Sequence, residues 1–309
     1  MMAAQNPCLQ SFNVGTWCAR ASVSDKIIAG LNMRALLTMV VLCGVLGNGR
    51  CMAESVQARH ARVELVSAQS NIAPGQQLWL GLHFSLEKNW HIYWTNPGDS
   101  GQPPVLQWQL PARVTAGAIQ WPLPEKLTRS TLADYGYQDD VVLLVPVQLG
   151  SKLENGGKAE IGLTAKWLIC ADVCIPDHAQ LHLSLPVSST STADPAQESL
   201  FSNSLKRLPK PWPHTWKSSA VSRKNDFVVS VTAGKPIAVA EFFPLLADQI
   251  DNAAPQPLQP ERAGVKITLR KSEQLLNPVH VLKGLLVLGN GESYIMEAPV
   301  TPAPSQVHN

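Results

Sequence analysis

The sequence predicts an all-β protein in which an immunoglobulin-like β-sandwich at residues 54–188 precedes a second, smaller β-domain at residues 222–302. From about residue 60 onward, apolar residues recur at every second position, the period of a strand with one buried face. Turn-rich segments separate these runs at the spacing typical of an antiparallel sandwich. The chain contains 24 prolines, and only 16% of its residues are charged, which fits a β-rich chain with many turns.

Three runs carry the strand pattern of the predicted sandwich. They extend from Leu78 to Leu86, from Ile161 to Ile169 and from Leu181 to Leu185. Residues 96–101 and 153–158 are rich in turn-forming residues and lie between the runs. Each run therefore predicts a strand that buries alternate side chains in one core.

Residues 189–221 are predicted to form a linker with a short helix. A polar serine and threonine stretch at 188–192 precedes an amphipathic run at 196–208. Asp194 suits the N-cap of a helix, Pro195 its first position and Pro209 its end. We therefore expect one helix between the two β-domains.

Strand patterns return in the second β-domain. They cover residues 227–231, 265–269 and 281–288, and the pair Asn290-Gly291 indicates a tight turn after the last of them. Residues 303–309 are expected to form a tail.

Residues 1–53 indicate a signal peptide with a mis-annotated N-terminal extension. Met33 and Arg34 precede an apolar run at 35–46, and the pattern of a cleavage site ends at Ala53. The run is shorter than the ~20 residues that a membrane-spanning helix needs. We expect translation to start at Met33 and the exported chain to begin after Ala53.

The charge of the chain gives no sign of a nucleic-acid partner. The formal net charge is +2, and the lysines and arginines are scattered along the sequence. Proteins that bind nucleic acids usually gather basic residues on one face. Nucleic acid is therefore not an expected partner.

Export would leave Cys170 and Cys174 as the only thiols, since the other four cysteines lie at positions 8, 18, 43 and 51. In an oxidising compartment such a pair is either a structural disulfide or a redox-active dithiol. The pair lies in the predicted connection between two strands, and three intervening residues allow a disulfide if the connection turns tightly. A ring this small stabilises a fold little, which favours redox use.

Metal binding is the alternative, because the spacing continues as Cys170-x3-Cys174-x3-His178-x3-His182. On a helix these four side chains would share a face. Pro176 and the period-two pattern favour a strand, which would leave both histidines on the outer face and away from the thiols. The spacing also departs from the usual zinc pattern, so no metal site and no cofactor are expected, and copper capture stays the alternative.

Four motifs follow one another along the chain, at residues 90–101 (WHIYWTNPGDSG), 119–124 (IQWPLP), 134–137 (DYGY) and 167–176 (WLICADVCIP). Together they resemble the periplasmic N-terminal domain of the thiol:disulfide interchange protein DsbD family and lie in the family's order. The resemblance is closest to the copper-tolerance branch typified by ScsB. Residues 242–244 and 253–256 resemble the second β-domain of that branch.

This resemblance implies a periplasmic thiol:disulfide oxidoreductase component, a protein-disulfide reductase. Reductant would come from a membrane electron-donor protein of the DsbD type and pass to periplasmic thioredoxin-like or disulfide-isomerase-like proteins. Cys174 matches the cysteine that forms the mixed disulfide, and Cys170 matches the resolving cysteine. The implied roles are disulfide reduction, cytochrome c biogenesis or copper tolerance. A further alternative is a non-catalytic interaction module with a structural disulfide.

The resemblance also implies a cap that shields the disulfide, at residues 131–138. Tyr135 and Tyr137 are its candidate aromatic side chains. The cluster of Trp90, Tyr93 and Trp94 is instead expected to pack in the sandwich core. Family members usually continue into a membrane domain and a thioredoxin-like domain, and neither is found before Asn309. We therefore expect either a separate membrane partner or a chain that is the remnant of a truncated or split gene.

Overall fold

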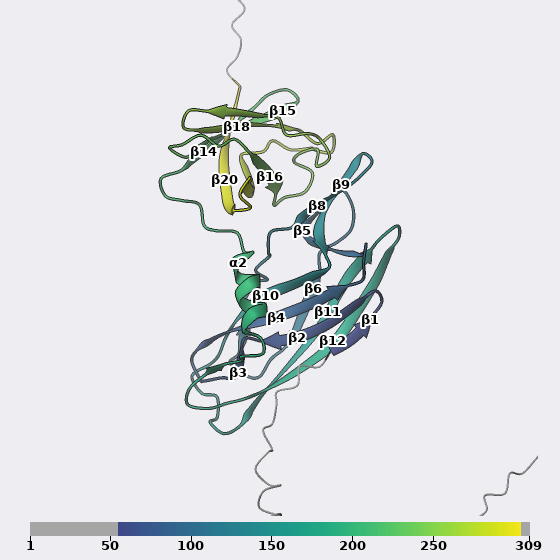
Figure 1. The fold of residues 1–309 in the computed structure, drawn as a ribbon, viewed down its shortest axis with the longest axis vertical. Helices are drawn as coiled ribbons and strands as arrows, with labels where there is room; N and C mark the ends of the chain where they lie inside the picture. The colour runs from purple at the N-terminus through teal and green to yellow at the C-terminus, as the bar shows by residue number, and fades with distance from the viewer. Residues whose placement is uncertain (1–54, 304–309) are drawn as a thin grey trace, which may run out of the picture. The chain divides into compact units, whose positions relative to one another are not determined.

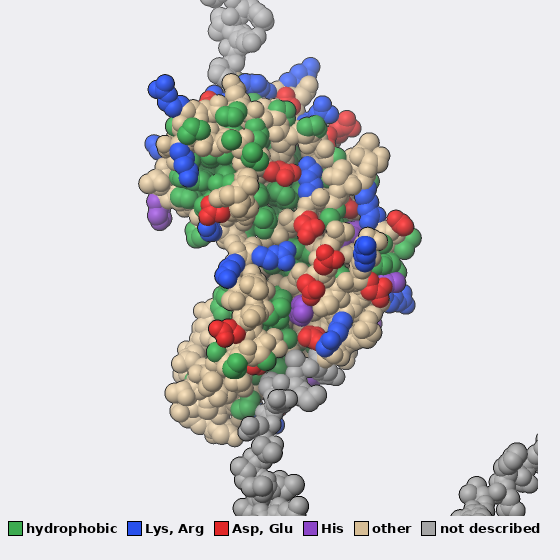
Figure 2. Space-filling model, in the orientation of Figure 1, with side chains coloured by type: hydrophobic (Ala, Val, Ile, Leu, Met, Phe, Trp, Pro, Cys, Tyr) green, Lys and Arg blue, Asp and Glu red, His purple; other side chains and the backbone are tan. Residues whose placement is uncertain are grey.

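The computed structural model describes residues 55–303 (Figure 1). The predicted signal peptide, with the cysteines at positions 8, 18, 43 and 51, lies outside the described residues, as does the tail from residue 304. Almost all regular structure in the described part of the chain is β-strand, which confirms the predicted fold class. On the face drawn in Figure 2, acidic and basic side chains are interspersed.

The first β-region packs two sheets face to face, with apolar side chains of alternate residues filling the space between them. One sheet has the order β1 (Ser55–Ala58), β2 (Ala61–Ser67), β4 (Gln77–Leu86), β10 (Asp140–Gln148), β7 (Thr115–Ala116). The other has the order β12 (Cys174–Pro186), β11 (Lys158–Cys170), β5 (His91–Gly98), β9 (Leu132–Gln138), β8 (Glu125–Arg129), with β6 (Val105–Gln109) also paired to β11. The short strands β3 (Gln69–Asn71) and β13 (Thr192–Ala193) pair with each other.

The three predicted strands of the sandwich are present as β4, β11 and β12. Their alternate apolar residues are buried, from Leu78 to Phe84 in β4 and from Ile161 to Ile169 in β11. β11 and β12 form one long antiparallel pair that ends at the two cysteines. The core therefore fixes which residues of these strands face inward.

The C-terminal strands form a separate sheet (Figure 1) that has a core of its own. Its order is β16 (Ala240–Pro244), β19 (Val281–Leu288), β20 (Ser293–Pro302), β14 (Lys217–Ser222), β15 (Asp226–Thr232), β18 (Gly264–Arg270), β17 (Leu258–Glu261). β14 and β20 pair in parallel, and all other neighbours are antiparallel. The predicted turn joins β19 to β20, with Gly291 at a φ of 83°.

The helix α2 (Glu198–Lys206) is shorter than predicted. Its N-cap is Gln197, so the prediction of Asp194 as N-cap was wrong. The Asp194 carboxylate instead accepts a hydrogen bond of 3.0 Å from the backbone N–H of Ala196, which closes a local turn before the helix begins. One face of α2 packs on the outer face of the first sheet, where Phe201 contacts a cluster that includes Val142.

We expect Phe201→Ala to lower the free energy of unfolding by about 3 kcal/mol, because the ring is 4% exposed and its removal leaves a cavity. Leu205→Ala on the same helix is the control, since Leu205 is 39% exposed. Urea denaturation would measure both. Equal losses would mean that the helix does not depend on the Phe201 contact.

Candidate functional site

The candidate site lies where β11 and β12 join. β11 ends at Cys170, β12 begins at Cys174, and the register of the pair places these two residues directly opposite each other. Their sulfur atoms form a disulfide of 2.07 Å, with a Cα–Cα distance of 4.1 Å. The structure thus brings together both cysteines predicted for the site.

The two cysteines differ in their exposure to solvent. Cys170 is 1% exposed, whereas Cys174 is exposed. β11 lies between β12 and β5, so Cys170 has a neighbouring strand on each side, while β12 is the edge strand. Cys174 is therefore the more accessible residue of the pair.

A tyrosine from β5 lies against the exposed cysteine. The hydroxyl of Tyr93 is 3.4 Å from the Cys174 sulfur, and the side chain is 1% exposed. Gly101 closes over the ring, with a φ of 81°, and a Cβ added there would lie 2.1 Å from the Tyr93 Cζ. Only glycine combines this backbone conformation with so close an approach.

Hydrogen bonds to β9 hold the loop that carries Gly101. The backbone N–H and the hydroxyl of Ser100 donate to the Asp134 carboxylate at 2.9 and 3.0 Å. The Asp99 carboxylate accepts a bond of 2.7 Å from the backbone N–H of Ala133. Burial raises the pKa of Asp134, and the bonds from Ser100 oppose that rise.

The hairpin of β8 and β9 contacts the connection between the cysteines. The guanidinium of Arg129, at the end of β8, donates to the backbone carbonyl of Ala171. Leu132, opposite Arg129 in the hairpin, is 52% exposed. A positive charge therefore contacts the connection between the cysteines, and an exposed apolar side chain is the strand partner of the residue that carries it.

A buried histidine lies on the other side of Cys170. His91 on β5 is the direct partner of Cys170 in the strand register and is 1% exposed. Neither of its ring nitrogens has a hydrogen-bond partner among the described residues. Burial, with a smaller effect from the charge of Arg129, lowers the pKa of His91 to about 4, so the imidazole is neutral near pH 7.

A family model described as "Thiol:disulfide interchange protein DsbD, N-terminal" matches residues 62–186. The chain carries a DsbD N-terminal-like domain. The N-terminal periplasmic domain of ScsB from Proteus mirabilis is a similar solved structure, with a TM-score of 0.57 and 15% identity over 78% of this chain and 94% of that chain. The periplasmic chaperone SfaE aligns over 77% of this chain and all of that chain at 9% identity, but a TM-score of 0.21 is too low to indicate a shared fold. No curated protein sequence matches the chain.

The family match supports a role in thiol–disulfide exchange and therefore contact with thiol–disulfide partners. The disulfide of the DsbD N-terminal-like domain lies within the matched residues. Among the described residues, no helix has both the length and the apolar character required to cross a membrane.

The structure places both predicted cap tyrosines in the core cluster of the sandwich. Tyr137 donates to the Pro122 carbonyl at 2.8 Å, and Tyr135 donates to the Asn252 side chain at 3.3 Å. Burial raises the pKa of both phenols. In the described structure neither hydroxyl bonds to the disulfide, and shielding by either tyrosine stays a prediction.

The sequence analysis missed the roles of His91 and Tyr93 beside the disulfide. Tyr93 is buried, as expected, but its hydroxyl faces Cys174 and its ring is not part of the sandwich core cluster. The strand period contained the signal, since Ile92 and Trp94 belong to that core and their neighbours must face the opposite side. Trp90 is only partly buried and stacks on His60.

His178 and His182 lie on the exposed face of β12, as predicted. Each is four residues from the next member of the motif, which in a strand corresponds to ~13 Å. One metal ion cannot bridge such distances. In the described part of the chain, no group of three or more histidine, cysteine or acidic side chains is suited to hold a metal.

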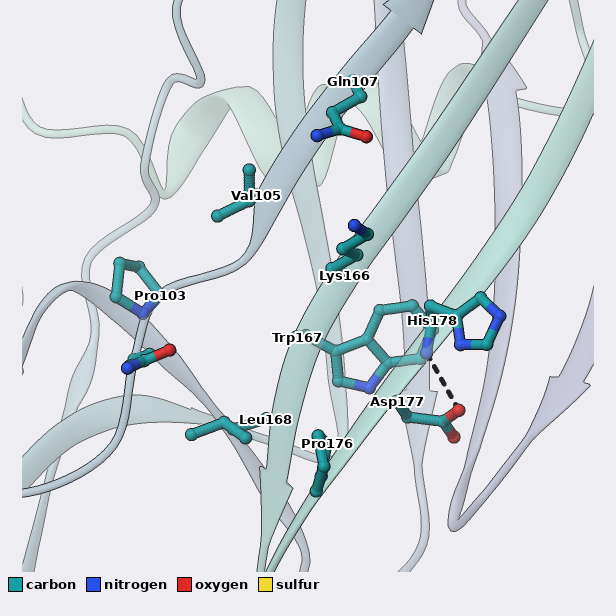
Figure 3. Close-up of a pocket in the computed structure, with 10 residues that line it drawn as sticks. Pro103, Val105, Gln107, Lys166, Trp167, Leu168, Pro176, Asp177 and His178 are labelled. Carbon is teal, nitrogen blue, oxygen red and sulfur yellow. Dashed lines mark hydrogen bonds between the residues drawn. The ribbon is translucent and has the colours of Figure 1, made fainter.

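An open groove of about 530 Å³ is lined by residues of β6, β11 and β12 (Figure 3). Leu168 and Pro176 line it, and each is two residues from a cysteine on the same strand. Val105, 53% exposed, and Lys166 line it further along. The groove offers an extended surface next to the exposed sulfur.

We expect the stability of the protein to fall as pH decreases from 6.5 to 4. The folded state holds the pKa of His91 at about 4 against an ordinary value of 6.5, so the unfolded state binds the proton first and gains up to about 3 kcal/mol. His91→Phe should remove this part of the pH dependence. Urea denaturation at about pH 7.0, 5.5 and 4.5 would measure the free energy of unfolding of both proteins.

The exposed residue His182 supplies the matched control for this experiment. His182→Phe should leave the pH dependence as in the unsubstituted protein. If His91→Phe and the unsubstituted protein lose stability in parallel over this pH range, the conclusion that His91 is neutral in the folded protein would be wrong.

Proposed function

We propose that this chain is a periplasmic relay for reductant. The Cys170–Cys174 pair would receive electrons from a membrane donor of the DsbD type and pass them to oxidised periplasmic proteins. The observation that carries the proposal is the asymmetry of the pair, with an exposed Cys174 and a buried Cys170 joined in one tight connection. The family match and the periplasmic origin of the similar ScsB domain support the same compartment and chemistry.

The asymmetry supports the following order of steps. In the reduced protein the Cys174 thiolate attacks one sulfur of a partner disulfide, and the partner's other sulfur leaves as a thiolate. Cys170 then attacks the Cys174 sulfur, which restores the internal disulfide and releases the partner's second sulfur. The partner gains two electrons and two protons, and the Cys170–Cys174 pair loses them.

We propose a docking surface for a thioredoxin-like or disulfide-isomerase-like protein around the disulfide. Val173, in the connection itself, is 62% exposed. Leu132 extends the surface on the β8–β9 hairpin, and Val105 extends it along the groove. Transient redox partners bury little area, so exposed aliphatic side chains around one reactive sulfur suit a weak and brief complex. Disulfide reduction, cytochrome c biogenesis or copper tolerance would be the processes served.

Cys170→Ala should accumulate a mixed disulfide, because Cys174 still attacks but no thiol remains to resolve the product. Cys174→Ala should accumulate little, since Cys170 is 1% exposed. Incubation of each reduced variant with glutathione disulfide, followed by mass spectrometry, would quantify the adducts. The unsubstituted disulfide should equilibrate with glutathione at a potential above about −300 mV.

Three results would contradict the relay. Equal amounts of glutathione adduct on the two variants would contradict the proposal that Cys174 attacks first and Cys170 resolves. A disulfide that resists mild reductant in the folded protein would favour a structural bridge. Tight copper(I) binding that is lost in His178→Ala or His182→Ala would favour a metal carrier.

Tyr93→Phe should slow alkylation of Cys174 by iodoacetamide about 2- to 10-fold at neutral pH, measured in the Cys170→Ala background. The Tyr93 hydroxyl is 3.4 Å from the sulfur and can donate to the thiolate, and one such bond contributes about 0.5–1.5 kcal/mol. Tyr137→Phe is the control, because its hydroxyl binds the Pro122 carbonyl. If alkylation slows in Tyr137→Phe and not in Tyr93→Phe, the hydroxyl that contacts the Cys174 thiolate would be that of Tyr137, in the predicted cap.

A further inference from the structure

We infer that His91 accepts the proton of the Cys170 thiol when Cys170 resolves the mixed disulfide. This inference rests on the proposed relay and names the residue that moves a proton within it. The argument depends on where β5 places the imidazole, on its lack of other partners and on the chemistry of a buried thiol.

Cys174, Cys170 and His91 lie side by side on three adjacent strands. Cys170 is paired with Cys174 on β12 and with His91 on β5. Directly paired residues of antiparallel strands point to the same face, with Cβ atoms ~4.5–5.5 Å apart. The imidazole is therefore the neighbour of the Cys170 sulfur on the side opposite to Cys174.

The imidazole is held by packing and not by hydrogen bonds. Its ring meets the edge of the Tyr93 ring at a centroid distance of 5.1 Å, and both of its nitrogens are buried without a partner in the described structure. A buried polar group without a hydrogen bond costs about 1–3 kcal/mol and calls for an explanation. A thiol proton that is present only in the reduced protein would supply the missing partner.

The resolving step requires Cys170 to lose a proton where water has little access. Only the thiolate is nucleophilic, and Cys170 is 1% exposed. The proton passes from the Cys170 sulfur to a nitrogen of His91, and the sulfur's electron pair attacks the Cys174 sulfur. The bond between Cys174 and the partner's sulfur breaks, and that sulfur leaves as a thiolate. His91 then returns the proton to the partner thiolate or to water.

The groups around this face set when His91 holds a proton. Arg129 on β8 disfavours a second positive charge, while the acidic side chains of Asp134 on β9 and Asp99 in the adjoining loop are held by hydrogen bonds. Tyr93 on β5 itself stays neutral near pH 7, since burial raises the pKa of its phenol. The lowered pKa of His91 in the disulfide form means that the imidazole gives up the proton once the internal bond has closed.

Reaction of the reduced protein with dithiobis(nitrobenzoate) separates the two steps. Attack by Cys174 releases one coloured thionitrobenzoate, and resolution by Cys170 releases the second. His91→Phe should slow the second phase about tenfold or more at pH 7 and leave the first within about twofold, because a general base contributes at least that much. The difference should shrink as pH rises, since hydroxide then removes the thiol proton.

Two further variants make the result specific. His91→Gln keeps a polar side chain that does not titrate, so it should also slow the second phase, and it decides the matter if His91→Phe does not fold. His182→Phe, at an exposed position on β12, should leave both phases unchanged.

A second phase in the His91 variants with the rate and pH profile of the unsubstituted protein would overturn the role of His91. Failure of the relay itself would look different. The unsubstituted protein would then release a single thionitrobenzoate and form no internal disulfide, which would overturn both proposals.

Discussion

The pairing of β11 with β12 is the constraint on which the site depends. The register runs from Lys158 opposite Pro186 to Cys170 opposite Cys174. Trp167, Ile169 and the other inward residues of β11 fill the core, and a slip by one residue would turn all of them outward. Packing along the whole strand pair therefore holds the two cysteines opposite each other. We therefore expect the connection to keep its place when the sulfur–sulfur bond opens.

The same pairing separates the roles of the two sulfurs. β12 is an edge strand, so Cys174 meets solvent, while β5 covers Cys170 from the other side. Strand order contributes to this difference, and the buried Tyr93 side chain lies on the same face, against Cys174. The residue on β5 opposite Cys170 then becomes its chemical environment, and that residue is His91.

Local patterns in the sequence predicted the strands and the place of the cysteines, since a period of two needs only neighbouring residues. Contacts that depend on pairing between distant strands could not be predicted in this way. The cap predicted at residues 131–138 lies almost entirely in β9, where alternation puts Tyr135 and Tyr137 in the core cluster. His91 and Tyr93 lie far from the cysteines in sequence, so only the register reveals them. The prediction that α2 starts after Asp194 was wrong because the Asp194 side chain stabilises a turn that competes with the helix.

Burial of Cys170 creates a conflict that the neighbouring histidine resolves. An exposed resolving thiol would exchange protons with water easily, but it would leave both sulfurs open to small thiols. A buried thiol is protected and loses its proton slowly. A base inside the sheet removes this limit without opening the site, provided that it is neutral when the disulfide is closed. Burial and the Arg129 charge both favour the neutral imidazole of His91, whose unprotonated ring nitrogen can accept the proton of the Cys170 thiol.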